Sequence, residues 1–305
     1  KGYRNFLNKL WNANNFLITN ECNFKSINKP NLTLNINKWI YNELIEIKEK
    51  IEQNIKDYRF DEAAKNAYKF SWHSYCDWYL ELSKTILNSE DNDAKKEVKA
   101  TASYVFKQIL KILHPFIPFI TEEIWLNNKF DSSGKDYLMY SNWVDDDIQK
   151  DQSFYDVKKI IGIISEIRSF KNELNVSPGS FTEISMQKLD TTTKNFINNN
   201  QMILKKLGRI NNFYENDLDK PSASIIISGE IYKVYFDENV DLNLIKSNLV
   251  KRQQKYQDEL NNITKRLSNK GFIDRAPKNI VDQEKTNYNI LENDIKKISL
   301  TIESL

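Results

Sequence analysis

Residues 3–18 read YRNFLNKLWNANNFLI, and this stretch decides how the beginning of the chain folds. Apolar side chains recur three and four positions apart, as at Leu7, Leu10 and Trp11, and polar side chains fill the positions between them. This spacing predicts an amphipathic helix. Because the same period returns through most of the chain, we expect a mainly α-helical protein.

The composition supports a helical protein. Among the 305 residues there are only 7 Gly and 6 Pro, whereas sandwiches, barrels and Gly-rich nucleotide loops use more glycine. Two cysteines are too few for a disulfide framework or a multi-cysteine zinc site, so we expect no metal. No apolar run reaches the roughly 18 residues of a membrane span, and no signal peptide is recognisable. We therefore expect a cytoplasmic protein without a membrane partner.

Residues 1–150 are predicted to form a helical bundle. After the first helix, a second is expected through about residue 55, with Asn35 or Asn37 as its N-cap. A third starts at Asp61 and continues to residue 82 as one aromatic-rich helix. A fourth runs over 94–113, and Pro118 begins a short fifth.

The rest of the chain has two further patterns. Residues 151–240 mix helices, expected over 155–173 and 191–207, with strand-like runs, and we expect a small α+β domain. Residues 241–305 hold two heptad-patterned stretches joined by a Gly/Pro link, which is typical of an antiparallel coiled-coil hairpin.

Motifs of known catalytic sites are missing from the sequence. It has no Gly-rich phosphate loop, no paired-His metal motif and no Gly-x-Ser-x-Gly elbow. His73, among aromatic residues, is interpreted as a packed helix residue, and His114 before Pro115 as a helix end. We therefore expect no catalytic residue and no metal site in this chain.

The first helix is a candidate RNA-binding element. The net charge of the chain is only +2, so a basic footprint must be local. Arg4, Asn8, Asn12 and Asn15 recur on one stripe, and Arg and Asn suit the edge and phosphate of an unstacked base. An ordinary solvated face explains the stripe equally well. The candidate RNA-binding residues of this helix are Arg4, Asn8, Lys9, Asn12, Asn15 and Phe16.

The hairpin is the second candidate. Between Lys246 and Lys278 there are nine basic residues and three acidic ones, and the basic residues gather on the first helix and the tip. A charge run is usually a solvated face, but charge segregated along a stiff arm favours a contact with a phosphate backbone. The candidate residues of the arm are Lys251, Arg252, Lys255, Lys265, Arg266, Lys270 and Arg275.

Five segments together resemble the valine–tRNA ligase family. They are YRNFLNKLWNA at 3–13, CDWYLELSK at 76–84, LHPFIPFITEEIW at 113–125, IRS at 167–169 with NVSP at 175–178, and LSNKGF at 267–272 with AP at 276–277. The resemblance spans the whole chain. It implies an anticodon-binding bundle over 1–150, an α+β domain over 151–240 and a tRNA-binding arm over 241–305.

The resemblance also implies a larger enzyme. Its class I signatures, His-Ile-Gly-His and Lys-Met-Ser-Lys-Ser, lie upstream in the family and are absent here. We thus expect a catalytically inactive, monomeric part of an enzyme whose other domains carry out catalysis and editing. The full enzyme would activate valine with ATP and Mg²⁺ and transfer it to valine tRNA, without binding DNA. An isoleucine- or leucine-type ligase, or a helical scaffold that binds no RNA, are the alternatives.

Overall fold

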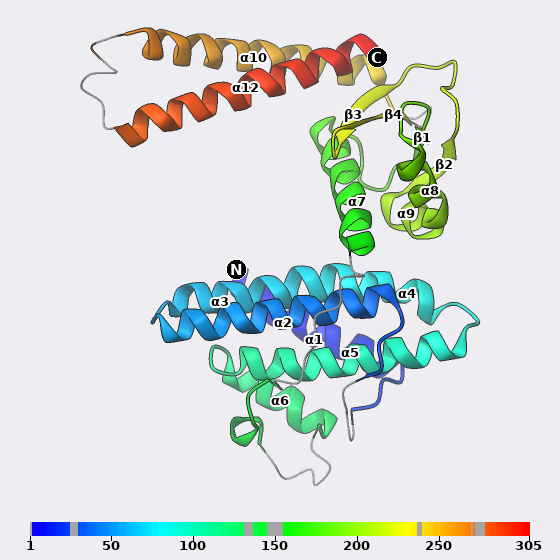
Figure 1. The fold of residues 1–305 in the computed structure, drawn as a ribbon, viewed down its shortest axis with the longest axis vertical. Helices are drawn as coiled ribbons and strands as arrows, with labels where there is room; N and C mark the ends of the chain where they lie inside the picture. The colour runs from blue at the N-terminus through cyan, green and yellow to red at the C-terminus, as the bar shows by residue number, and fades with distance from the viewer. Residues whose placement is uncertain are drawn as a thin grey trace. The chain divides into compact units, whose positions relative to one another are not determined.

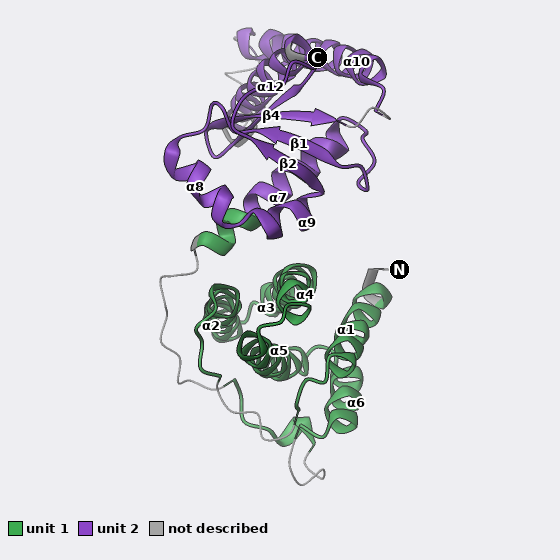
Figure 2. Ribbon diagram, turned by 90° about the vertical axis from the view of Figure 1, so that its right-hand side faces the viewer, with its two compact units in different colours: residues 1–161 green, residues 162–305 purple. Residues whose placement is uncertain are grey.

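The structure is a computed structural model that describes residues 2–24, 30–130, 137–144, 155–236, 240–269, 271 and 278–305. The chain forms two compact units, residues 1–161 and residues 162–305, which Figure 2 shows in different colours. Both are mainly helical, and the second also holds a small sheet. The predicted mainly α fold class, with a small α+β part and a helical hairpin near the C-terminus, is confirmed.

The first unit is a helical bundle around α5 (Figure 1). Its elements are α1 (Gly2–Thr19), α2 (Asn35–Lys56), α3 (Phe60–Lys69), the π-helix η1 (Phe70–Tyr79), α4 (Leu80–Leu87), α5 (Asn92–Leu113), α6 (Pro118–Asn128), the 3₁₀ turn η2 (Leu138–Tyr140) and the start of α7 (Tyr155–Glu173). The last four turns of α5 are almost continuously buried, and Ile109, Leu110 and Ile112 are inaccessible to solvent. These turns are buried on all sides, with the polar side chains of Gln108 and Lys111 buried among apolar ones, so this part of α5 lies in the centre of the core.

The third predicted helix differs from the expectation, because its middle third is a π-helix. Wide π turns are rare and often mark functional sites. In η1 they bury Phe70, Tyr75 and Tyr79, while Tyr75 donates a 2.8 Å hydrogen bond to the Ala102 carbonyl of α5. The spacing of aromatic residues in a π-helix differs little from their spacing in an α-helix. The sequence pattern therefore predicted a helix but not its wide turns.

A glutamate of another helix, and not an asparagine, holds the start of α2. The residue before α2, Leu34, makes no side-chain cap, so the predicted Asn35 or Asn37 cap is wrong. Instead Glu97 of α5 accepts hydrogen bonds of 2.9 Å from the amides of Thr33 and Leu34 and from the Asn37 side chain, and its other oxygen accepts one from the Thr33 hydroxyl. A carboxylate at a helix N-terminus is also favoured by the helix dipole.

Glu97 makes the stability of the first unit depend on pH. Partial burial raises the pKa of Glu97, but the hydrogen bonds from Thr33, Asn37 and Leu34 outweigh it and leave the pKa below the ordinary value of 4.5. A lowered folded-state pKa adds stability above the unfolded-state value, and this stability is lost as pH falls through the folded-state pKa.

We expect Glu97→Gln to lower the free energy of unfolding by about 1–2 kcal/mol at pH 7, a modest figure because the site is partly solvated. The difference should shrink as pH falls below 4.5 and through the lowered folded-state pKa of Glu97, where wild-type Glu97 itself becomes protonated. Urea unfolding can be followed by tryptophan fluorescence, since all 6 Trp lie within residues 1–161. Exposed Glu90→Gln is the control, and an equal effect from both variants would contradict the role of Glu97 at the start of α2.

The second unit combines helices with a four-stranded sheet of order β2-β1-β4-β3. Its strands are β1 (Thr182–Ser185), β2 (Ile210–Tyr214), β3 (Ala223–Ile227) and β4 (Glu230–Phe236). β1 runs parallel to β2 and antiparallel to β4, with Ile184 opposite Val234. Ser228 and Gly229, with φ of 52° and 86°, form the β3–β4 turn, and positive φ at both positions is what a tight hairpin needs.

Helices α8 (Thr191–Asn199) and α9 (Gln201–Gly208) connect β1 to β2. One helix over 191–207 was expected, but Asn200 interrupts it with φ of −117°. Asp190 caps the first piece by accepting a hydrogen bond from the Thr193 amide. The predicted α7 has the bounds that the structure shows, Tyr155–Glu173.

A buried lysine joins α7 to the end of α9. Lys171 is only 2% exposed, and its ammonium donates to the carbonyls of Ser180 at 3.0 Å, and of Gly208 and Arg209 at 3.2 Å each. Arg168, one turn earlier on α7, donates to the Leu207 carbonyl at 2.7 Å. Two cations thus satisfy carbonyls at the C-terminus of α9, where the helix dipole favours positive charge.

The arm consists of α10 (Leu242–Ser268) and α12 (Lys278–Ser304), which lie side by side (Figure 1). Gln253 of α10 donates to the Ser299 hydroxyl, whereas the later Arg266 pairs with the earlier Glu284, so the helices run antiparallel. At the base of the arm, Thr301 of α12 donates a 3.3 Å hydrogen bond to the Ser224 carbonyl of β3. The arm is therefore seated on the edge of the sheet.

Candidate nucleic-acid interface

The polar stripe of α1 faces solvent. Arg4, Asn8, Asn12 and Asn15 are all exposed. The opposite face is buried in the bundle, with Phe6, Leu10, Ala13 and Leu17 between 0 and 6% exposed. Burial of one face fixes the rotation of α1 about its axis. The four polar side chains therefore point to solvent together, and none of them is buried.

Two other candidate residues of α1, Lys9 and Phe16, lie where α1 meets the η1–α4 helix. Lys9 Nζ is 2.7 Å from Asp77 Oδ1 and lies 5.8 Å from the centre of the Trp72 ring. Lys84 of α4 places its ammonium 5.8 Å from the centre of the Phe16 ring. The surface that begins on α1 therefore continues onto η1 and α4, which the sequence pattern of α1 alone did not indicate.

An aromatic cluster adjoins Lys9. The Phe6 ring centre is 4.8 Å from that of Tyr68 and 6.0 Å from that of Trp72, with Phe6 and Trp72 stacked. Tyr68 remains 37% exposed. His73 was interpreted as a packed residue, but its side chain is 59% exposed and Nδ1 lies 3.3 Å from Asp77 Oδ2. The wide turns of η1 carry His73 outward while Tyr75 and Cys76 point into the core.

The other reactive residue types have structural surroundings. Burial raises the pKa of Cys76 to about 12 and that of Cys22 to about 11, so both thiols stay protonated near neutral pH. His114 Nδ1 lies 2.9 Å from the Thr121 hydroxyl, which fits its interpretation as part of the helix end. Within the described residues, no group of three or more His, Cys, Asp or Glu side chains is placed to hold a metal ion.

On the arm, the candidate residues fall into separate groups. Lys251, Lys255 and Lys265 are exposed on the face of α10 that points away from α12, and Lys255 Nζ lies 3.9 Å from Glu259 Oε1 of the same helix. Arg252 is half-buried, stacks on Tyr256 with 5.1 Å between guanidinium and ring centre, and lies 3.9 Å from Glu173. Arg266 is 2.8 Å from Glu284. Lys270 and Arg275 lie outside the described residues.

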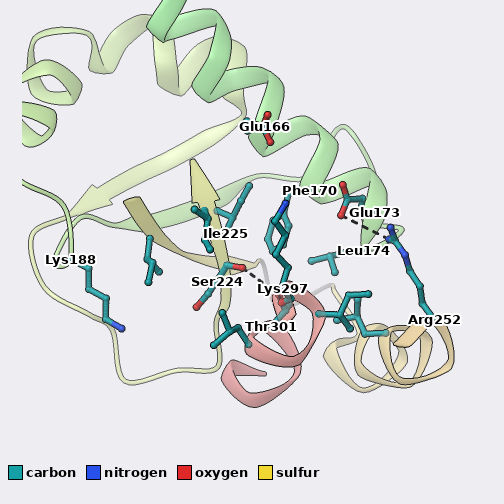
Figure 3. A pocket seen from close by; sticks show the side chains of 15 residues that line it. Glu166, Phe170, Glu173, Leu174, Lys188, Ser224, Ile225, Arg252, Lys297 and Thr301 are labelled. Atoms are coloured by element: carbon teal, nitrogen blue, oxygen red, sulfur yellow. Dashed lines mark hydrogen bonds and ion pairs between the residues drawn. The ribbon is translucent and has the colours of Figure 1, made fainter. Parts of the chain in front are cut away.

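The base of the arm encloses a cavity of about 180 Å³ (Figure 3). Its floor is apolar, formed by Phe170, Ile225, Leu249 and Ile298. Charged side chains surround it, and the Glu173–Arg252 ion pair is drawn at one side. Arg252 of α10 thus directs its charge at Glu173 of α7, and this ion pair belongs to the contact between the two helices.

No helix in the described part of the chain is long and apolar enough to cross a membrane.

Two family models match the sequence. The model described as the anticodon-binding domain of tRNA ligase matches residues 37–186, and the one described as the valyl tRNA synthetase tRNA binding arm matches residues 241–305. Helix α1 precedes the first match, and the second match begins with α10.

Curated relatives match along the chain. A valine–tRNA ligase of Pelagibacter ubique is 67% identical over 306 residues, covering all of this chain and 35% of that protein. Valine–tRNA ligases of Bartonella quintana and Agrobacterium fabrum are 32% and 33% identical, covering 100% and 93% of this chain. The chain spans about a third of the length of these relatives. An anticodon-binding domain, a tRNA binding arm and relatives that share one name place the chain in the valine–tRNA ligase family.

Proposed function

We propose that this chain binds valine tRNA at two places as part of a valine–tRNA ligase. The bundle binds the anticodon, and the arm contacts the body of the same tRNA. The observation that carries the proposal is that two tRNA-directed matches occur together with two exposed sets of side chains, one on α1, which belongs to the same bundle as the first match, and one on α10, which lies within the second. Bulk charge cannot explain RNA binding here, because the net charge is only +2.

The division of labour follows the sequence boundaries. Residues 1–150 form the anticodon-binding part, residues 151–240 the α+β part that carries the arm, and residues 241–305 the arm. The anticodon contacts are Arg4, Asn8, Lys9, Asn12, Asn15 and Phe16. On the arm, the exposed Lys251, Lys255 and Lys265 are the principal phosphate contacts. The candidate set is completed by Arg252, Arg266, Lys270 and Arg275. Arg252 and Arg266 contact RNA only if it displaces the carboxylates that pair with them.

The chemistry of the parent enzyme belongs to its other domains. We propose that a monomeric cytoplasmic enzyme activates valine with ATP and Mg²⁺ and esterifies it to valine tRNA, while this part holds the tRNA and supplies no catalytic residue. DNA is not a partner. The relatives named valine–tRNA ligase favour this substrate over isoleucine or leucine tRNA.

The test is a filter-binding comparison of valine tRNA with isoleucine tRNA between about 50 and 200 mM salt. We expect tighter binding of valine tRNA and an affinity that falls steeply with salt, because phosphate contacts release counterions. Arg4→Ala, Asn8→Ala and Asn12→Ala should each weaken binding by about 1–3 kcal/mol if they contact bases or phosphates. Lys50→Ala, on the exposed side of α2, is the matched control.

Binding of both tRNAs with equal affinity would contradict recognition of valine tRNA. If the three α1 variants bind like the control, the stripe is a solvated face and the anticodon site lies elsewhere on the bundle. A chain that binds no tRNA at low salt would favour the helical scaffold alternative.

A further inference from the structure

The cavity at the base of the arm lies where separate parts of the second unit meet (Figure 3). Its floor is shared by α7, β3 and the two helices of the arm, through Phe170, Ile225, Leu249 and Ile298. Few voids larger than a water molecule persist in protein interiors, because an unfilled space costs its lining the dispersion contacts of missing neighbours. A void of about 180 Å³ at this junction is therefore a candidate ligand site.

The size and the floor of the cavity define the body of a ligand. An apolar cavity of about 150 Å³ lined by Leu, Ile and Phe stays dry and binds benzene. The cavity at the base of the arm has a similar volume, and the same residue types form its floor. At its rim, Ile226 and Leu300 remain 42% and 48% exposed, so they offer further apolar surface to a molecule that enters from solvent. The body that fits is a single aromatic ring or a branched aliphatic group.

The charged side chains around the floor favour an anion. Three are cations and two are carboxylates, which leaves a net charge of +1: Lys188, Arg252, Lys297, Glu166 and Glu173. The Glu173 carboxylate already lies 3.9 Å from the Arg252 guanidinium. Lys297 has no ion-pair partner within the part of the chain that the structure describes. An anionic ligand can therefore engage Lys297 without displacing another group.

Lys297 lies on the side of α12 that faces the sheet. Thr301, one turn later, donates hydrogen bonds to the Ser224 carbonyl of β3 and to the Lys297 carbonyl. Residues four apart share a face of a helix, so the Lys297 side chain leaves α12 on this same side. The remaining carboxylate, Glu166, precedes Phe170 by one turn of α7, and Figure 3 shows it beyond Phe170 from Ser224 and Thr301. An anionic group at the arm end of the floor thus meets Lys297 and not Glu166.

We propose that this cavity binds a small carboxylate whose body is a single aromatic ring or a branched aliphatic group. The body fills the floor between Phe170 and Ile298, and the carboxylate pairs with the Lys297 ammonium at the mouth. Because the bound molecule contacts α7, β3 and both helices of the arm at once, it holds the arm on the sheet. The site is separate from the exposed lysines of α10, and the inference does not depend on tRNA binding.

The test uses three probes with the same phenyl ring and different charges: phenylacetate, 2-phenylethanol and phenethylammonium. Each is titrated into the full 305-residue chain, labelled at its isoleucine methyl groups, while methyl NMR spectra are recorded. Ring currents of a bound phenyl group should shift the signals of Ile225 and Ile298, which the variants Ile225→Val and Ile298→Val assign. We expect phenylacetate to bind about three- to five-fold more tightly than 2-phenylethanol, the gain of one partly solvated ion pair, and phenethylammonium to bind more weakly than either.

Lys297→Ala separates the effect of the charge from that of the cavity. It should reduce phenylacetate binding to the level of 2-phenylethanol and leave 2-phenylethanol binding unchanged. Lys296→Ala is the matched control, because this neighbouring lysine is exposed, lies 3.6 Å from Glu292 and is turned by about 100° around α12. It should change the binding of no probe. Both lysines are exposed, so both variants should fold, which circular dichroism without the probes can check.

Occupancy should also stabilise the second unit. A ligand that binds only the folded chain shifts the unfolding equilibrium by mass action. Phenylacetate should therefore raise the urea concentration at which the folded-state methyl signal of Ile225 is lost. The signal of Ile109, in the core of the first unit, should be lost at the same urea concentration with and without phenylacetate.

Three results would overturn the site. Unchanged Ile225 and Ile298 signals at millimolar concentrations of every probe would show that the cavity admits no ligand. Equal binding of the three probes, or equal losses from the two lysine variants, would show that no carboxylate is selected here. Tightest binding of phenethylammonium would show that Glu166 and Glu173 determine the charge of the ligand. None of these measurements includes RNA, so their outcome is independent of the proposed tRNA binding.

Discussion

Lys171→Met is expected to destabilise the second unit by about 3–5 kcal/mol. The ammonium donates to three carbonyls from a position that is 2% exposed. Methionine fills a similar volume but leaves those buried acceptors without this donor, and the loss includes their desolvation. Far-UV circular dichroism during urea unfolding should show an early transition in the variant.

Tryptophan fluorescence should barely change in the same experiment, because it reports on residues 1–161 alone. Lys206→Met, an exposed lysine of α9, provides the same substitution without burial and should be neutral. If the two variants unfold alike, the carbonyls are satisfied by other groups and Lys171 is dispensable.

The second expected result concerns RNA binding by the arm. Replacing Lys251, Lys255 and Lys265 together with alanine should reduce affinity for valine tRNA roughly 10- to 100-fold near physiological salt. The slope of log affinity against log salt should become shallower by about one for each phosphate that the variant no longer neutralises. These lysines face away from α12, so the hairpin should fold as before, which circular dichroism can check.

A triple alanine variant at Lys285, Lys296 and Lys297 removes the same charge from α12, where acidic residues predominate. It should weaken binding much less. Equal losses from the two variants would mean that only total charge matters. No loss from either would leave the arm as a structural element.

Local patterns predicted the elements well where the structure is decided locally. The apolar period of α7 and the turn after it define the bounds of that helix. The heptads of α10 and α12 predict a hairpin, because the apolar seam of one helix must pack against a matching seam of the other. The exposed stripe on α1 followed from the same reasoning, since the apolar residues of one face determine what the other face presents.

Pairings between distant residues could not be predicted in this way. Arg252 and Arg266 look alike in a basic run, and only the approach of Glu173 and Glu284 from other helices shows that both are paired. The sequence does not distinguish Lys171 from a surface lysine of α7, because its burial depends on the end of α9 packing over it. Asp77 lies within a segment that resembles the family, but its contact with Lys9 requires α1 and η1 to be adjacent.

The π-helix η1 sets where the length of this chain can vary. A π turn holds about one residue more than an α turn, so the helices on either side keep their facing although the segment is longer. Deleting one residue between Phe70 and Tyr79 would therefore allow a turn of ordinary α geometry there without a large rotation of α4, and Leu82 and Ser83 would stay in the core. A deletion inside α4 has no wide turn to absorb it, and it would rotate the rest of that helix by about 100°, so that Lys84 would no longer face Phe16. Single-residue gaps among functional relatives are therefore expected within η1 and not in the helix that follows it.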